Sequence, residues 1–287
     1  MTSRSRFVVA NRLRHHLLEW GADGPVVLLL HGFLEHAHTW DLAAPRLAAA
    51  GHHVFALDWR GHGDSEWIGA GGYYHFADYA ADLAFLLRAL GGRAALVAHS
   101  MGATAAMHYA GVEPERVAGL VLVDGLGPPD MDPQPPPGRF RAWIGDLERV
   151  AGRALAPMTL DDATRRLGER FLRFSPDVAR HMAEHGTRAA PGGVVWKFDP
   201  LHQTSAPVPF SRTRSMALWR EVACPVLYVE GGDSGLRLDP GDKAERLAVL
   251  RARTATVPGA GHHPHLERPE VFADLVLDFL GGLPCAD

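Results

Sequence analysis

The segment Leu96-Val97-Ala98-His99-Ser100-Met101-Gly102 indicates how the chain around it is folded. Apolar residues typical of a strand lead up to Ser100, and a helix-forming run from Met101 to Gly111 follows it. The pattern matches G-x-S-x-G, in which a serine occupies a strained turn between a strand and a helix, except that Ala98 replaces the first glycine. We therefore predict that Ser100 is an exposed nucleophile. The alternative is a serine that only caps the helix.

Strand-like and helix-like runs alternate on both sides of this segment. Val26 to Leu30 and Val117 to Val123 are continuously apolar, as expected of strands covered on both faces. Apolar strands separated by helical segments predict the α/β class, with a mostly parallel, doubly wound sheet between two layers of helices. The other elements that we expect are an opening hairpin of Phe7–Ala10 and Arg14–Trp20, strands His53–Asp58, Ala94–His99, Pro225–Val229 and Thr254–Val257, and helices Ala37–Ala50, His75–Leu90, Gly241–Arg251 and Leu266–Leu280.

The alternation stops after the sixth strand. Gly127 to Gly138 is rich in proline, which fits neither a strand nor a helix interior, and the chain beyond it is predicted to be helical and strandless. Within it, Ser175-Pro176 is typical of the start of a helix. We expect residues 127–218 to form a helical lid inserted between residues 1–126 and 219–287 of the core, because open α/β sheets bind ligands where their strands end. A purely structural subdomain is the alternative.

Two further loops carry groups that a serine nucleophile needs. His31-Gly32-Phe33 closes the strand Val26–Leu30, and in this architecture such a loop supplies one backbone N–H of an oxyanion hole. The second N–H belongs to the residue after the nucleophile, so Phe33 and Met101 are predicted to form the hole.

The general base is expected in a glycine-flanked loop between the last strand and the last helix. Gly259-Ala260-Gly261-His262 places a histidine where it can reach Ser100 from above the sheet. His263 and His265 follow closely, so the alternative is that the loop is merely rich in histidine and that none of the three is a general base. The spacing favours His262.

Composition and charge exclude several classes of function. The chain has 287 residues, of which 47% are hydrophobic, so it can bury a sizeable core. Its formal net charge of -4 offers no footprint for nucleic acid or an anionic membrane. Cys224 and Cys285 lack the spacing of a zinc site or a redox pair. No apolar run is long enough for a secretory signal peptide or a membrane-spanning helix. We expect a cytoplasmic protein with a small-molecule substrate; the oligomeric state is not predicted.

Motifs for cofactors are missing from the sequence. No G-x-G-x-x-G follows a strand and no G-x-x-x-x-G-K-S/T occurs, so neither dinucleotide nor nucleotide phosphates have a cradle. The segment His36-Ala37-His38-Thr39-Trp40-Asp41 nearly matches a binuclear metal motif, but its aspartate is one residue late and its last histidine is absent. We expect neither a cofactor nor a metal.

Taken in order, the motifs resemble the α/β-hydrolase superfamily over nearly the whole chain. The resemblance rests on His31-Gly32-Phe33, on Asp58 to Ser65 (DWRGHGDS), on the turn at Ser100 and on Gly261-His262. Trp196 to Pro200 (WKFDP) is similar to a segment of the serine-hydrolase-like proteins within that superfamily. The glycines and polar residues of Asp58 to Ser65 are expected to have a structural role.

The resemblance implies a triad in the order nucleophile, acid, histidine, which gives Ser100, Asp233 and His262. Asp233 lies in Glu230-Gly231-Gly232-Asp233, one residue earlier than the family's usual G-x-x-D. Asp124, directly after Val117–Val123, is the alternative acid, because some members supply it from that strand end. Asp233 is preferred, because its glycines let a loop rise toward the histidine.

The expected activity is that of a cofactor-free serine hydrolase that cleaves an ester, thioester or lactone through an acyl-enzyme. The serine excludes the epoxide hydrolases and haloalkane dehalogenases of this superfamily, which need an aspartate there. Carbon–carbon bond hydrolases and perhydrolases use the same triad and remain alternatives, as does a ligand receptor without activity. Phe140 and Trp143, with Phe171 and Trp196, predict an apolar pocket for a medium-sized hydrophobic compound, although packing within the lid explains them equally well.

Overall fold

An eight-stranded sheet forms the centre of the computed structural model, which describes residues 2–129, 136–151, 155–236 and 238–284. The strand order is β1-β2-β4-β3-β5-β6-β9-β10; β1 and β2 form an antiparallel hairpin, β2 is antiparallel to β4, and every other neighbouring pair is parallel. This confirms the α/β class. The strands are β1 (Arg4–Ala10), β2 (Leu13–Trp20), β3 (Val26–Leu30), β4 (His53–Leu57), β5 (Ala94–His99), β6 (Val117–Val123), β9 (Val226–Gly231) and β10 (Arg253–Val257).

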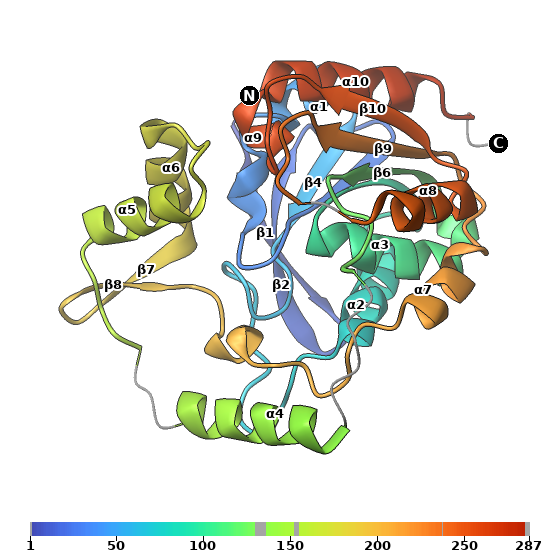
Figure 1. Cartoon of the computed structure of the whole chain (residues 1–287). Helices are drawn as coiled ribbons and strands as arrows, with labels where there is room; N and C mark the ends of the chain where they lie inside the picture. Colours follow the sequence, from blue (N-terminus) through green and yellow to red (C-terminus); the bar gives the residue numbers. More distant parts are fainter. Residues whose placement is uncertain (1, 130–135, 152–154, 237, 285–287) are drawn as a thin grey trace.

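Two helical layers cover the sheet (Figure 1). Side chains alternate along each strand, so Leu28 and Leu30 of β3 pack into one apolar cluster and Val27 and Leu29 into the other. Burial on both faces is why these strands are apolar throughout. The first face is covered by α2 (Phe76–Ala89), α3 (Met101–Val112), α7 (Arg212–Trp219) and α8 (Pro240–Val249), and the second by η1 (Ala37–Trp40), α1 (Ala44–Ala49) and α10 (Pro269–Gly281).

Two of the expected helices are each divided. The run Ala37–Ala50 forms a short 3₁₀ helix, η1, and then α1, which has Pro45 in its first turn. The run Leu266–Leu280 forms α9 (Pro264–Glu267) and α10, which are separated at Arg268. Pro269 explains the second break, because the residue before a proline is disfavoured in helical conformation.

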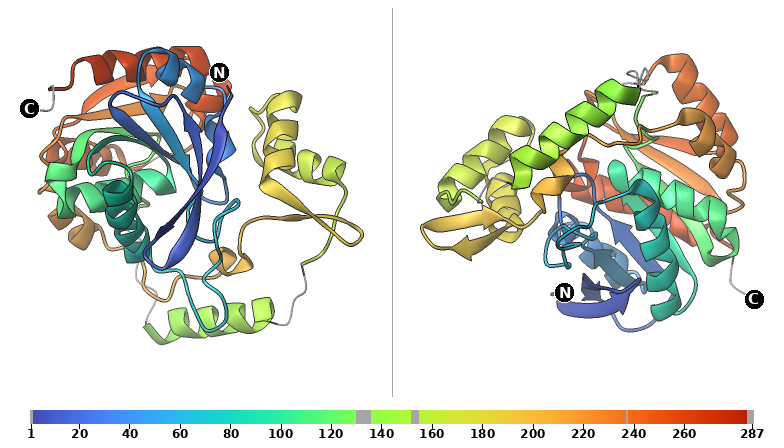
Figure 2. Two further views of the ribbon diagram at one scale, coloured as in Figure 1. Left: turned by 180° about the vertical axis from the view of Figure 1, so that it is seen from behind. Right: turned by 90° about the horizontal axis from the view of Figure 1, so that it is seen from below.

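Most of the chain between β6 and α7 stands to one side of the sheet (Figures 1 and 2). It contains α4 (Pro136–Ala151), α5 (Leu160–Arg170), α6 (Pro176–Gly186), η3 (Pro200–Gln203) and a small antiparallel sheet of β7 (Thr187–Ala190) and β8 (Gly193–Trp196). The expectation that this segment has no strands is therefore wrong. A turn with positive φ at Gly192 and Gly193 lets the two short strands pair.

The ends of this inserted segment also differ from expectation. Residues 130–135 of the proline-rich exit lie outside the described residues. At the other end, the predicted boundary at residue 218 falls inside α7, which packs against α3 and buries Trp219 in the core. Ser175 does cap α6 as expected, since its side chain accepts a hydrogen bond from the Val178 N–H.

A helix that crosses a lipid bilayer must be both long and apolar. No helix in the described part of the chain combines the two properties.

Candidate active site

Ser100 occupies a strained turn between β5 and α3. Its φ of 49° lies in the left-handed region, which a residue with a side chain rarely adopts and which is common at functional sites. Crowding explains the small neighbours: a Cβ at Gly102 would stand 2.6 Å from the His31 carbonyl oxygen, and one at Gly125 would stand 2.8 Å from the Ser100 Cα. The sequence prediction of a sharp strand-to-helix turn at Ser100 is confirmed.

Ser100, His262 and Asp124 form a continuous hydrogen-bonded chain. The His262 Nε2 lies 3.1 Å from the Ser100 Oγ, and the His262 Nδ1 lies 2.6 Å from the Asp124 Oδ2. Because Nδ1 faces a carboxylate, it carries the ring proton, which leaves the lone pair of Nε2 directed at the serine hydroxyl. The Asp124 side chain is 2% exposed and that of His262 is 25% exposed, so the acid is shielded from water and the base is accessible.

The structure corrects the preference for Asp233. Its side chain is 55% exposed and forms an ion pair with Arg173, with 3.0 Å between the Arg173 Nη2 and the Asp233 Oδ2. The physical reason is the tight turn after β9, in which the Asp233 N–H donates to the Ala260 carbonyl and the side chain points outward. Asp124, the alternative, follows β6, the immediate neighbour of the strand that carries Ser100.

One residue beside Asp233 does reach the acid. The Ser234 Oγ donates to the Asp124 Oδ2 at 2.6 Å, the same oxygen that His262 contacts. The sequence analysis missed Ser234, although it follows the glycine-rich turn that attracted attention to Asp233. With donors on both sides of this oxygen, the Asp124 carboxylate has little freedom to turn away from the imidazole.

The other two histidines of the loop point elsewhere. The His263 Nε2 lies 3.1 Å from the Glu35 Oε1, and the His265 Nε2 lies 3.1 Å from the Thr39 Oγ1. His265 also stacks on Trp40, with ring centroids 4.4 Å apart. Of the three histidines in this loop, the structure places only His262 against Ser100.

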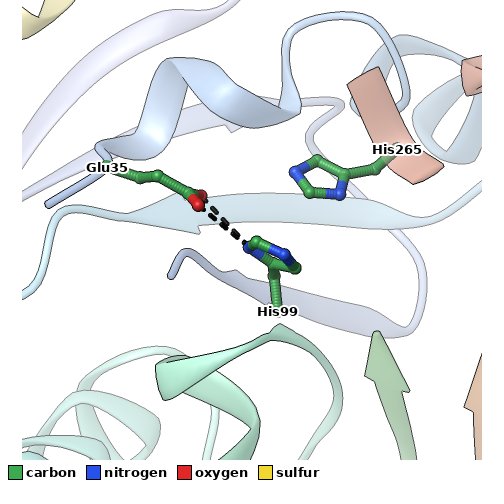
Figure 3. Close-up of side chains that lie close together, drawn as sticks. All are labelled: Glu35, His99 and His265. Atoms are coloured by element: carbon green, nitrogen blue, oxygen red, sulfur yellow. Dashed lines mark hydrogen bonds and ion pairs between the residues drawn. The ribbon is translucent and has the colours of Figure 1, made fainter. Parts of the chain in front are cut away.

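A buried carboxylate, Glu35, connects the loops around the serine (Figure 3). It accepts the Gly32 N–H at 3.1 Å, contacts His263, and faces the Nδ1 of His99, the residue before Ser100, at 3.1 Å. The other ring nitrogen of His99, Nε2, lies 2.8 Å from the His262 carbonyl oxygen. Glu35 thereby holds the loop after β3, the turn at Ser100 and the histidine loop in one arrangement.

The contacts of His99 fix its charge. Both of its ring nitrogens face acceptors, so both carry a proton and the ring is an imidazolium. Burial alone would lower the pKa of His99, but the Glu35 carboxylate beside it raises that pKa. In turn, burial would raise the pKa of Glu35, and the neighbouring His99 and His263 hold it well below its usual range. A buried ion pair therefore lies directly behind the serine and the histidine.

Phe33 and Met101, the predicted oxyanion-hole residues, lie on neighbouring parts of the structure. Phe33 belongs to the loop after β3, Met101 is the first residue of α3, and β3 pairs with β5 at Leu30 and Ala98. The close approach of Gly102 to the His31 carbonyl brings the start of the helix against this loop. Both backbone N–H groups remain candidates for the hole.

A mostly apolar cavity of about 190 Å³ lies between the loop after β3 and the inserted segment. Phe171 lines it and also packs against the loop that carries His262, since its ring centroid is 4.8 Å from that of His263. Trp196 lines the cavity as well, whereas Phe140 and Trp143 do not. The Trp143 ring instead packs against Tyr73, with 5.5 Å between the ring centroids. The other lining residues are Phe33, Leu34, Glu35, His36, Arg166, Leu167, Arg170, Phe174, Met182, Gly186, Phe198 and Gln203.

The loop Asp58 to Ser65 has a structural role. The Asp58 carboxylate accepts the N–H groups of Ala37 and Asp64, at 2.6 and 2.9 Å, and contacts the His16 ring. A Cβ at Gly63 would collide with this carboxylate, and the φ of Gly63 is also positive. These contacts fasten η1 and the loop to the sheet, as the polar residues of this segment predicted.

Proteins with related sequences and structures are hydrolases. Residues 27–275 match the model of the alpha/beta hydrolase family, and the chain belongs to that family. Epoxide hydrolase A of Mycobacterium tuberculosis is 28% identical, with 97% of each chain covered. A serine hydrolase-like protein of Danio rerio is 27% identical, with 91% of this chain and 83% of the relative covered. The thioesterase domain from the curacin biosynthetic pathway superimposes with a TM-score of 0.87 at 26% identity, covering 97% of this chain and all (100%) of that domain.

The family relationship supports two of the sequence predictions. The chain is an α/β-hydrolase-type enzyme, and its relatives include serine hydrolase-like proteins, as the motifs indicated. Activities differ among these relatives, since one is an epoxide hydrolase and another a thioesterase domain. The activities of the relatives therefore do not define the substrate of this protein, and the lining of its own site is the guide to the substrate.

Proposed function

We propose that this protein is a serine hydrolase that cleaves an acyl ester or thioester through an acyl-enzyme. The observation that carries the proposal is the chain of contacts from the Ser100 Oγ through the His262 ring to the Asp124 carboxylate, at 3.1 and 2.6 Å. A hydroxyl is a weak nucleophile until a neighbouring base accepts its proton, and this arrangement supplies that base together with a group that orients it.

The chemistry follows from the positions of the protons. The His262 Nε2 accepts the hydroxyl proton as the Ser100 Oγ bonds to the acyl carbon, and the carbonyl electron pair moves onto oxygen. Asp124 accepts the Nδ1–H and stabilises the imidazolium that forms. The imidazolium then gives its proton to the leaving alcohol or thiol as the bond to the acyl carbon breaks. Water, deprotonated by His262, hydrolyses the acyl-serine and regenerates the hydroxyl.

The negatively charged oxygen of the tetrahedral intermediate needs hydrogen-bond donors. The backbone N–H groups of Phe33 and Met101 are the candidates, because they lie at the ends of adjacent strands beside Ser100. Glu35 supports this role indirectly, since its bond to the Gly32 N–H fixes the loop that carries Phe33.

The cavity suggests the kind of acyl group. Phe171, Phe174 and Trp196 give it aromatic walls, which suit a medium-sized hydrophobic or aromatic acyl chain. The thioesterase domain that this chain resembles acts within a biosynthetic pathway, as its description states, which adds thioesters to the compounds to be tested.

A panel of p-nitrophenyl esters and acyl thioesters with increasing chain length tests the proposal. We expect hydrolysis of at least the medium-length members by the wild-type protein. Ser100→Ala is expected to retain only the roughly 10³ to 10⁴-fold acceleration that binding and the oxyanion hole can provide without the nucleophile. Turnover by Ser100→Ala at the wild-type rate would refute the proposal.

A further inference from the structure

A group of histidines and one aspartate lies outside the active site, between η1 and α6. We name His38, Asp41, His181 and His185 the junction cluster. His38 belongs to η1 and Asp41 follows it, whereas His181 and His185 lie one helical turn apart on α6 and so share a face of that helix. The inserted segment and the core thus each contribute two side chains.

The four side chains converge. One ligand atom from each of His38, Asp41 and His185 lies within 4.8 Å of the others. The His38 Nδ1 is 2.7 Å from the Asp41 Oδ2, and the His181 Nε2 is 3.3 Å from that same oxygen. The His185 ring stacks on His38, with centroids 3.7 Å apart, and lies 4.7 Å from the ring of His181.

The junction cluster is open to water. The side chains of His38, Asp41 and His181 are 18%, 23% and 29% exposed, so an ion can enter and keep a water ligand. Two other compact groups of this kind occur among the described residues. Glu35, His99 and His265 are buried, and Glu35 already pairs with His99. In the group of His16, Asp58 and Asp64, the Asp58 carboxylate is already bound to the His16 ring and the Ala37 N–H. The junction cluster is therefore the best metal site of the three.

We propose that the junction cluster binds one divalent transition metal ion, with Zn²⁺ as its reference ligand. Three imidazoles and one carboxylate are nitrogen and oxygen donors of the kind that Zn²⁺, Co²⁺ and Ni²⁺ accept in four-coordinate or somewhat larger sites. The ligand atoms of His38, Asp41 and His185 are close enough for small rotations of these partly exposed side chains to bring them to coordination distance. The His181 Nε2, 3.3 Å from the Asp41 Oδ2, is near enough to join them as a fourth ligand. The ion would replace the present hydrogen bonds between the histidines and Asp41.

Such a site explains why the sequence alone did not indicate a metal. The segment from His36 to Asp41 offers only part of a ligand set, and the missing histidines come from α6, about 140 residues later in the chain. Folding supplies them from the inserted segment. The proposed ion is single and has a structural role, which differs from the binuclear hydrolytic site that the local motif partly matches.

A metal at this position would connect α6 to the core beside the cavity. Met182 and Gly186 of the same helix line the cavity, and the His36 Nε2 already contacts the Met182 carbonyl at 3.0 Å. Occupancy of the junction cluster would hold this wall of the cavity in place. Binding of the ion itself does not depend on the proposed hydrolase activity.

Titration of the metal-free protein, prepared without a polyhistidine tag, tests the proposal. Isothermal titration with Zn²⁺ is expected to give one site per chain, and Co²⁺ is expected to give the visible absorption of a low-coordinate nitrogen and oxygen site. The double variant His181→Ala/His185→Ala should lose this binding by about tenfold or more in affinity, and the Co²⁺ spectrum with it. Zn²⁺ should raise the Tm of the wild type and leave that of the double variant unchanged.

Three controls decide where the ion binds. His75→Ala, which removes an exposed histidine at the start of α2, should bind Zn²⁺ as the wild type does. His262→Ala should also bind it, which excludes the active site as the location. If the double variant fails to fold, Asp41→Asn and His185→Gln are each expected to weaken binding in its place. Unchanged Zn²⁺ affinity in these cluster variants, or loss of binding in His262→Ala, would overturn the proposal.

Discussion

Asp124 stands at the strand end nearest to Ser100, and its backbone and partners hold it there. Its φ of 44° lies in the left-handed region, and its N–H donates to the Val229 carbonyl at 2.8 Å. Two donors, the His262 ring and the Ser234 hydroxyl, converge on one carboxylate oxygen. Backbone and side chain together direct the carboxylate at the histidine.

We therefore expect Asp124→Asn to lower kcat by up to about 10⁴-fold with little loss of stability, since an amide presents the wrong partner to the Nδ1–H. Steady-state kinetics on the best ester of the panel would measure this. Asp233→Asn is the matched control: it breaks only an exposed ion pair with Arg173 and should leave kcat nearly unchanged. The opposite pattern would return the role of acid to Asp233.

The buried pair of Glu35 and His99 gives a second prediction. Glu35→Gln leaves the His99 imidazolium without its counter-charge, which should cost about 3 to 5 kcal/mol in the free energy of unfolding. Urea denaturation would measure the loss. Glu184→Gln, which removes one partner of an exposed pair with Arg180, should leave the free energy of unfolding nearly unchanged. Equal stability of the two variants would contradict the buried ion pair.

The same pair predicts a dependence of stability on pH. The pKa of His99 is raised on folding, so its contribution is complete below the unfolded-state value of about 6.5 and is lost as the pH rises through the folded value. The pKa of Glu35 is lowered, so its contribution is present above the unfolded value and is lost as the pH falls through the folded one. The difference in the free energy of unfolding between wild type and Glu35→Gln should be largest between the unfolded-state pKa values of the two groups, about 4.3 for glutamate and about 6.5 for histidine. A gap that does not vary with pH would refute the assignment.

At the scale of single residues, the sequence predicted Ser100 and His262 because each lies in a local pattern. The acid could not be chosen in that way, because Asp124 and Asp233 both follow strands and both precede glycine-rich or flexible turns. They are separated by their side chains: that of Asp124 contacts the His262 ring, whereas that of Asp233 points outward from its turn and pairs with Arg173 of the inserted segment. Glu35 was missed because its partners come from three separate loops.

The elements around Ser100 approach one another more closely than a side chain allows. A Cβ at Gly125 would stand 2.7 Å from the Ser100 carbonyl oxygen and 2.9 Å from the Ala103 Cβ. Gly125→Ala should therefore destabilise the protein by about 1 to 3 kcal/mol and lower kcat, because backbone must move next to both Ser100 and Asp124. Gly145→Ala on α4, where the added methyl group meets nothing within 4 Å, is the control and should be neutral or stabilising.

Urea denaturation and kinetics on the two glycine variants check this prediction. Similar stability of Gly125→Ala and Gly145→Ala would show that the turn tolerates a larger residue.

At the scale of elements, prediction succeeded for the central strands and failed for the short ones. β3 and β6 are continuous apolar runs between turn residues, so the sequence alone indicates that both faces of these strands are buried. β7 and β8 have four residues each and a mixed composition, TRAA and GVVW. They pair with each other in a separate two-stranded sheet, to which Met158 adds a single bridge at Val194. Such strands carry too weak a periodic signal to be distinguished from a loop.

At the scale of the whole molecule, the inserted segment and the core meet at the cavity. Arg173 of the inserted segment contacts Glu267 and Asp233 of the core, and His36 of the core contacts the Met182 carbonyl of α6. Glu267 in turn accepts the Gly261 N–H, next to His262. The inserted segment is therefore linked through polar contacts to the loop that carries the proposed base, as a lid would be.

Enlarging the cavity should change the choice of substrate. Phe171→Ala and Trp196→Ala remove aromatic walls, so we expect kcat/KM to shift toward longer or bulkier acyl chains on the ester panel. Trp143→Ala removes an aromatic residue of the inserted segment that does not line the cavity, and it should leave the order of preference unchanged. A shift caused by Trp143→Ala alone would place the acyl site near α4 instead.

Covalent labelling by a fluorophosphonate tests the central claim most directly. The wild-type protein should lose activity as it takes up one phosphonyl group per chain. Peptide mass spectrometry should find that group on Ser100, because this is the hydroxyl that the proposed base, His262, contacts. Ser100→Ala should not be labelled, and His262→Ala should be labelled far more slowly. Absence of labelling in the folded wild-type protein, or labelling that persists in Ser100→Ala, would contradict the account.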